Sequence, residues 1–148
     1  MKPGQFMLRL LRFFSRLRYR VFGSKSLRPY EQTCFDGWRN SLSEQARKTL
    51  DRQLSLSYFV QRQAGDAKVC FYWFGNNVPL FSRSDFALHV ATVVLEAAAD
   101  KQMNAKIYIH HGRFFSIEFP KRPARYMELH HMTGMPLKLA EVRTHVRL

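Results

Sequence analysis

The stretch Asn104-Ala-Lys-Ile-Tyr-Ile-His-His-Gly-Arg-Phe-Phe-Ser-Ile-Glu-Phe119 carries the clearest structural signal in this 148-residue chain. Apolar residues recur at every second position on both sides of its His-His-Gly sequence: Ile107 and Ile109 before it, and Phe115, Ile117 and Phe119 after it. Such alternation is typical of strands with one buried face, and Gly112 can adopt the positive φ of a tight turn. We therefore predict a β-hairpin over residues 105–119, which Pro120 ends.

Two segments before the hairpin also carry regular patterns. Residues 68–74 are aromatic and β-branched and lie between Gly-Asp and Gly-Asn-Asn, which predicts a strand buried on both faces. Residues 42–63 show apolar side chains at helical spacing: Leu42, Ala46, Leu50, Leu54 and Tyr58. Ser41 or Ser43 can cap this helix, and Glu44 and Lys48 can pair one turn apart. We predict one long helix over 42–63, ended by Ala-Gly-Asp.

The remaining segments give weaker signals. Residues 86–99 combine a helix-favouring Glu-Ala-Ala-Ala with a strand-favouring His-Val-Ala-Thr-Val-Val, and we expect a strand followed by a loop near 99–104. Residues 126–131 and 137–146 are predicted to be extended. The second of these alternates apolar residues with Arg143, His145 and Arg147, as in an edge strand with a solvated basic face. Residues 24–33 resemble a linker, and 34–40 a short anchoring turn.

Together these elements predict a small α+β fold. We expect an antiparallel sheet of four to five strands around the central hairpin 105–119, packed by one long helix and preceded by a basic amphipathic helix. The domains are then an N-terminal arm, residues 1–26, and a single α+β domain, residues 27–148. A hydrophobic content of 46% is ample for a real core.

The charge of the chain is concentrated at its N-terminus. The net charge is +13, and the first acidic residue is Glu31. The thirty residues before it contribute +8, whereas the other 118 carry 16 Lys and Arg against 11 Asp and Glu. Such asymmetry indicates that the arm, more than the domain, meets an anionic partner.

The arm has the pattern of an amphipathic helix. At about 100° per residue, Arg9, Arg12, Arg16 and Arg20 fall within an arc of roughly 80°, and apolar residues cover the opposite side. The residues predicted to contact a membrane or partner are Phe6, Arg9, Leu10, Arg12, Phe13, Phe14, Arg16, Leu17 and Arg20. No run of residues is long and apolar enough for a transmembrane helix, so any membrane contact is expected to be peripheral.

Three interpretations of this arm remain open. It can pack on its own domain, lie in the interface of an anionic membrane, or dock on an acidic protein or nucleic acid. We expect an interaction or accessory protein that the arm recruits to an anionic membrane surface or to a membrane-associated complex. The expected location is cytoplasmic and peripheral to the membrane. A mitochondrial location is the alternative, because the arm also has the Arg-rich, acid-free composition of a presequence.

Motifs that would indicate catalysis are absent from the sequence. It contains no Gly-rich phosphate loop, no paired carboxylates and no nucleophile elbow. The pairs at 110–111 and 130–131 are histidines, but neighbours on a strand point to opposite faces, so each pair offers one metal ligand. Cys34 and Cys70 form no metal motif, and Cys70 is expected to be a small buried apolar residue. We therefore predict no enzymatic activity, no cofactor and no metal site.

Nucleic acid is the alternative partner. A basic cluster follows the hairpin, and with the hairpin turn it could form a phosphate-tracking strip with stacking rings. The residues of this strip are Arg113, Phe114, Lys121, Arg122, Arg125 and Tyr126. The sequence matches no named DNA- or RNA-binding motif. The alternative function is therefore a small basic protein that binds RNA or a ribonucleoprotein.

Overall fold

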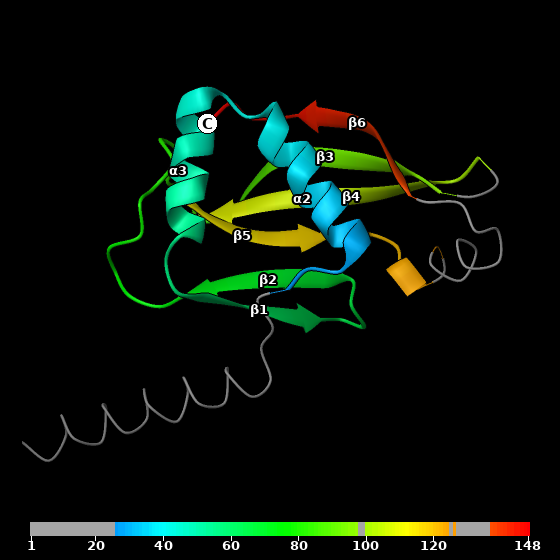
Figure 1. Ribbon diagram of the computed structural model, residues 1–148, viewed down its shortest axis with the longest axis horizontal. Helices are drawn as coiled ribbons and strands as arrows, with labels where there is room; N and C mark the ends of the chain where they lie inside the picture. Colours follow the sequence, from blue (N-terminus) through cyan, green and yellow to red (C-terminus); the bar gives the residue numbers. More distant parts are fainter. Residues whose placement is uncertain (1–25, 98–99, 125, 127–136) are drawn as a thin grey trace, which may run out of the picture.

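The computed structural model describes residues 26–97, 100–124, 126 and 137–148 (Figure 1). Among these residues, two helices pack on one six-stranded antiparallel sheet, which confirms the α+β class. The elements are α2 (Pro29–Ser41), α3 (Glu44–Leu54), β1 (Tyr58–Gln63), β2 (Lys68–Trp73), β3 (Leu88–Glu96), β4 (Gln102–His110), β5 (Arg113–Glu118) and β6 (Lys138–Thr144). The strand order is β1-β2-β5-β4-β3-β6, so the predicted hairpin lies at the centre of the sheet.

The hairpin is confirmed, with one correction to its faces. β4 and β5 pair antiparallel, and His111 and Gly112 form the turn with φ of 47° and 75°. Ile109 lies opposite Phe114, but Tyr108 lies opposite Ser116, so a β-bulge at Phe115 interrupts the alternation. The face that packs on the helices therefore carries Phe114 and Ile117. The prediction that Phe115 shares the face of Ile117 is wrong.

The single helix predicted over 42–63 is also wrong. Residues 29–41, predicted as a linker and a turn, form α2, and residues 58–63 form β1 instead of the last turns of a helix. Pro29 stands in the first turn of α2, where its missing N–H costs nothing. Ser43 caps α3 by accepting a hydrogen bond from the N–H of Ala46 at 3.2 Å. The predicted Glu44–Lys48 pair forms, at 2.6 Å.

The C-terminal half follows the sequence more closely. The strand expected within 86–99 is β3, and the predicted edge strand is β6. The sheet exceeds the predicted four to five strands because β1 had been assigned to a helix. The extended segment predicted for 126–131 lies outside the described residues, except for Tyr126, which is helical.

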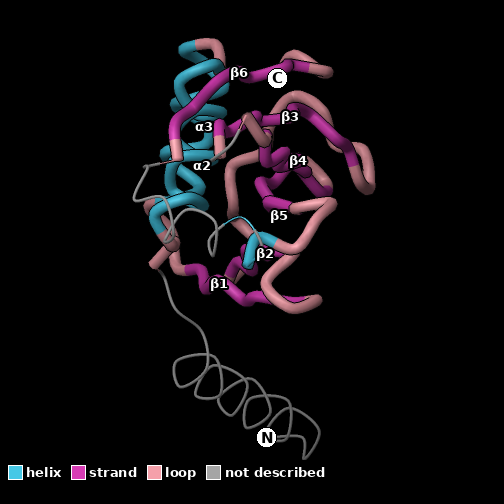
Figure 2. The backbone as a smooth tube through the Cα atoms, turned by 90° about the vertical axis from the view of Figure 1, so that its right-hand side faces the viewer, coloured by secondary structure: helices cyan, strands magenta, loops and turns pink. Residues whose placement is uncertain are grey.

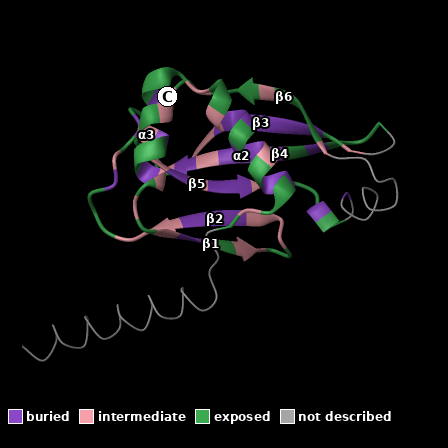
Figure 3. Cartoon of the chain, in the orientation of Figure 1, coloured by how far each residue is buried: buried purple, intermediate pink, exposed green. Residues whose placement is uncertain are grey.

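The core lies between the two helices and one face of the sheet. Figure 2 shows both helices on the same side of the strands, and Figure 3 shows buried residues along the central strands. Phe35 and Trp38 of α2 pack on Phe114, with ring centroids 5.4 and 5.0 Å apart, and Phe71 lies 4.4 Å beyond it. None of the described helices combines the length and apolar content that a membrane-spanning helix needs.

Candidate functional site

The side of the sheet opposite α2 and α3, here called the open face, carries polar and aromatic side chains. Val69 and Phe71 of β2 point to the core, so Lys68, Cys70 and Tyr72 project to the open face by the two-residue period of a strand. The register extends this set across the neighbouring strands. The open face includes Phe59, Lys106, Tyr108, His110, Ser116 and Glu118, together with Phe115 at the bulge.

Five rings on this face form a continuous series, here called the aromatic row: Phe59, Tyr72, Phe115, His110 and Phe86. Phe59 stacks on Tyr72 with centroids 5.0 Å apart, and Tyr72 meets Phe115 edge to face at 5.8 Å. His110 stacks on Phe115 at 3.8 Å and on Phe86 at 5.6 Å. Cross-strand aromatic pairs stabilise a sheet. Phe59 is buried, the three middle rings are half-buried, and Phe86 is exposed.

A second group on the same face consists of histidines. The rings of His89 and His145 lie 4.5 Å apart, and both Nε2 atoms lie within hydrogen-bond distance of the Thr92 hydroxyl, at 3.1 and 2.9 Å. Tyr108 stacks on His89 at 5.1 Å. The hydroxyl can donate to one imidazole and accept from the other, so it can join both rings when one Nε2 carries a proton and the other does not.

Lys68 and Glu118 form an ion pair on the open face. Lys68 contacts Glu118 at 2.8 Å, and its ammonium lies 5.4 Å from the Phe115 centroid. The hydrogen bond to Glu118 raises the pKa of Lys68, so this group stays cationic. Burial, then the nearby Lys68, lower the pKa of His110, and burial, then His145, lower the pKa of His89. At neutral pH the imidazoles of His110 and His89 are therefore neutral.

The loop before β3 places Phe86 at the end of the aromatic row. Two backbone hydrogen bonds join this loop to the hairpin turn. The Phe81 N–H donates to the Gly112 carbonyl at 2.8 Å, and the His111 N–H donates to the Asp85 carbonyl at 2.9 Å. A Cβ at Gly112 would lie 3.0 Å from the Leu80 Cβ, so the close approach requires glycine. Phe86 itself is 73% exposed.

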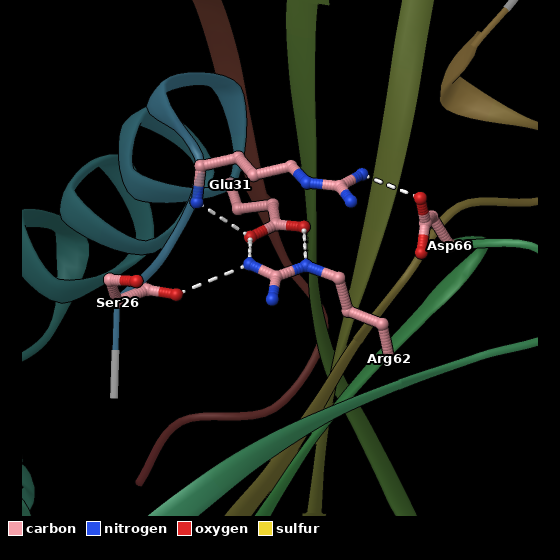
Figure 4. A network of polar contacts seen from close by, with 5 residues as sticks. Ser26, Glu31, Arg62 and Asp66 are labelled. Atoms are coloured by element: carbon pink, nitrogen blue, oxygen red, sulfur yellow. Dashed lines mark hydrogen bonds and ion pairs between the residues drawn. The ribbon is translucent and has the colours of Figure 1, made fainter. Parts of the chain in front are cut away.

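An ion pair with a fully buried carboxylate lies near Ser26, the first described residue (Figure 4). The guanidinium of Arg62 donates to both carboxylate oxygens of Glu31, at 2.9 and 2.5 Å. It also donates to the Ser26 carbonyl at 3.2 Å, and Arg28 bonds to Asp66 at 2.6 Å. Arg62 of β1, which Glu31 of α2 holds in place, therefore also binds the last residue of the predicted arm.

The site residues predicted from the sequence are only partly placed. The nine arm residues from Phe6 to Arg20 lie outside the described residues, as does Arg125. Lys121 and Arg122 are exposed and Arg113 is half-buried. Phe114 and Tyr126 are buried, 0% and 7% exposed, so neither offers the stacking ring that the predicted strip needed. The aromatic row was missed, although alternation along 68–74 could have indicated Tyr72.

Metal and nucleophile chemistry gain no support from the described residues. Within them, no three His, Cys, Asp or Glu side chains are grouped in a way that could hold a metal ion. Cys34 and Cys70 are free and buried, which confirms the prediction for Cys70. Burial raises the pKa of Cys34 to about 12 and also raises that of Cys70, so both thiols stay protonated and unreactive.

Comparison of the chain with models of protein families, with curated proteins and with solved structures finds no match. The functional inference therefore rests on the chain's own charges, rings and contacts.

Proposed function

We propose that this protein is a non-enzymatic interaction protein, recruited through its arm to an anionic membrane surface or to a membrane-associated complex. The observation that carries this proposal is the composition of residues 1–30, which contain eight cations, no acid and a series of large apolar residues. Anionic lipid offers both a negative surface and an apolar interior to such a segment. Nucleic acid matches the charge of the arm but leaves its apolar residues without a partner.

The described domain is consistent with a separate role for the arm. Its core cluster already joins both helices to five strands, β1 to β5, and Val142 of β6 packs against its margin with other partly buried residues from Leu27 to Leu148. The bond from Arg62 to the Ser26 carbonyl gives the arm a fixed point of attachment at β1. An arm attached in this way can bind a surface without rearrangement of the domain.

Vesicle flotation tests the proposal directly. Full-length protein should float with vesicles that contain anionic lipid and be released as salt rises, since each basic residue near such a surface contributes about 1 kcal/mol. Leu10→Asp with Phe14→Asp should abolish flotation by placing carboxylates on the apolar side of the arm.

A matched control separates the arm from net charge. Gln45→Glu with Asn76→Asp adds two carboxylates at exposed positions of the domain, and it should leave flotation almost unchanged. Equal binding to neutral vesicles, or binding to neither kind, would contradict recruitment by an anionic membrane.

We propose single-stranded nucleic acid as the second candidate partner, because one structural feature favours it. The open face combines the aromatic row with Lys68, Lys106 and Arg143, and bases stack on exposed rings while cations contact the phosphates. Phe86 is the most exposed ring of the row. This face replaces the strip around Phe114 as the expected binding surface.

Fluorescence anisotropy with labelled single strands tests this candidate. Affinity should fall with rising salt. The logarithm of the binding constant should decrease by about 0.7 per phosphate contact for each tenfold rise in salt concentration. Phe86→Ala should weaken binding, because stacking contributes about 1–3 kcal/mol per base. Leu80→Ala is the control, since Leu80 is 51% exposed on the same loop but belongs to no ring contact of the row. An equal effect of both substitutions would contradict stacking on the open face.

A further inference from the structure

Strand β6 forms one edge of the described sheet. Among the described strands it pairs with β3 alone, and none of the described elements lies beyond it in Figure 1. Six of its seven residues are exposed and Val142 is half-buried. An edge strand carries a row of backbone N–H and C=O groups that can pair with another strand. Proline would block such pairing, but residues 138–144 contain none.

The exposed charges of β6 have a symmetric pattern. Glu141 and Arg143 stand two residues apart, so both project to the open face. Within one chain they contact each other at 2.8 Å, and each side chain is about half exposed. Such an exposed pair contributes little on its own, so both groups are available to another partner at small cost.

We propose that β6 pairs antiparallel with β6 of a second copy of this chain, about a two-fold axis that lies between the two Val142 residues. In this register Glu141 of each copy lies opposite Arg143 of the other, and the two Val142 side chains face each other. Both charge pairs lie on the open face, and the two six-stranded sheets become one continuous sheet.

The two-fold axis restricts the choice of register. An axis perpendicular to the sheet keeps the helices of both copies on the same side. It must lie midway between a residue and the same residue of the second copy, because residues that face each other in an antiparallel pair project to the same side of the sheet. An axis through Glu141 would place two carboxylates together, and an axis through Arg143 two guanidinium groups. Like charges directly opposite each other destabilise a strand pair. The register centred on Val142 instead gives two opposite-charge pairs.

The bulge in β6 limits the length of the contact. Glu141 lies opposite Val94 and Leu139 opposite Leu95, so Ala140 is the extra residue. Regular pairing is therefore centred on residues 141–143. A contact this short predicts an association that depends on protein concentration. The resulting dimer would carry two arms, which would strengthen binding to any extended surface by raising the effective concentration of the second arm.

Charge reversal tests the register with full-length protein. In sedimentation velocity at physiological salt, the unmodified chain should shift from monomer to dimer as concentration rises. Glu141→Arg alone and Arg143→Glu alone should each remain monomeric, because both place like charges opposite each other. An equimolar mixture of these two variants should form a mixed dimer. The chain with both substitutions should again dimerise with itself.

A matched control and thermal melts exclude simpler explanations. Glu44→Arg makes the same change in net charge as Glu141→Arg, but at an exposed ion pair on α3. It should leave dimerisation unchanged. At low concentrations, where every protein is monomeric, melts should be similar for all variants, since the positions are exposed. A monomeric wild type at every concentration, single variants that dimerise normally, or a mixture that stays monomeric would each overturn the proposal. The pairing needs neither lipid nor nucleic acid, so its failure leaves the proposed function intact.

Discussion

The carboxylate of Glu31 is fully buried and is held by both Nε and Nη2 of Arg62, at 2.9 and 2.5 Å. It also accepts the backbone N–H of Arg28 at 2.8 Å, which caps α2. The Glu31 side chain thus accepts a hydrogen bond from a backbone N–H at the start of α2 and joins this helix to the edge strand β1. A buried charge is tolerated only when it is paired and hydrogen-bonded, so the two residues act as a unit.

Removing Arg62 should therefore cost more than removing both partners. Arg62→Leu leaves the Glu31 carboxylate buried without its counter-ion, which typically costs about 3–5 kcal/mol. Glu31→Leu together with Arg62→Leu removes both charges and should lose less, mainly the cap on Arg28, worth about 1 kcal/mol. Urea unfolding of the three proteins measures the difference.

The exposed pair of Glu44 and Lys48 on α3 provides the control. Lys48→Ala should change the free energy of unfolding by about 0.5 kcal/mol or less. A double variant at positions 31 and 62 that is less stable than Arg62→Leu would show that Glu31 stabilises the fold even without Arg62, and would contradict this prediction.

A second prediction concerns Gln53, whose buried amide joins α3 to the hairpin turn. Its Oε1 accepts the Phe114 N–H at 2.9 Å, and its Nε2 donates to the carbonyls of Pro79 and Gly112 at 2.7 and 3.1 Å. Gln53→Met would take this partner from the Phe114 N–H and the Pro79 carbonyl, at about 1–3 kcal/mol for each unsatisfied group, whereas the Gly112 carbonyl still accepts the Phe81 N–H. We expect a loss of at least about 2 kcal/mol in chemical denaturation.

Gln53→Glu should add a pH dependence of known sign. The introduced carboxyl would be buried and would face two carbonyl oxygens, so its pKa is raised in the folded state and only the protonated form donates. A folded state that binds more protons than the unfolded state loses stability as pH rises. Gln45→Glu, at an exposed position of α3, is the matched control. An equal pH slope in both variants would contradict the Gln53 network.

Local chemistry explains which elements could be predicted. The hairpin was readable because Gly112 and the alternation around it specify a turn and two strands within sixteen residues. β3 and β6 were readable from their β-branched residues. The β-bulge at Phe115 was not, since the sequence alone does not show which residue of β5 lacks a cross-strand partner.

Long-range pairing explains the errors. The helical spacing of Leu42 to Tyr58 continues past the end of α3, but residues 58–63 pair with β2 across a short turn. That pairing overrides the local pattern. The same limit applies to the candidate site: the aromatic row joins four strands and a loop, so it becomes visible only once the register is known. The arm is expected from charge and spacing alone, and because residues 1–25 lie outside the described residues it stays a prediction.

The histidines of the open face predict a loss of stability in mild acid. The pKa values of His110 and His89 are lowered from 6.5, first by burial. The unfolded chain therefore takes up protons at a higher pH than the folded domain, and stability falls as pH drops below that value. His110→Phe keeps a ring against Phe115 and should reduce the fall in melting temperature between pH 7 and pH 5. If His110→Phe left the fall in melting temperature unchanged, protonation of His110 would not contribute to the loss of stability in acid.

The last prediction concerns the division between arm and domain. Deletion of residues 1–26 should leave a folded protein that melts cooperatively within a few degrees of the full chain, because the described core already joins both helices to strands β1 to β5. The loss includes the Ser26 carbonyl bond to Arg62, which is exposed and should matter little. Differential scanning calorimetry and circular dichroism measure the effect.

The opposite result would have an equally clear meaning. If the apolar side chains of the arm filled part of the domain's core, each one lost would cost about 2–5 kcal/mol against a total stability of roughly 5–15 kcal/mol. The shortened chain would then unfold or aggregate. Leu10→Asp with Phe14→Asp in the full chain separates the two cases, since it should lower the melting temperature only if the arm packs on the domain. A large drop would remove the main reason to propose an anionic surface as the partner.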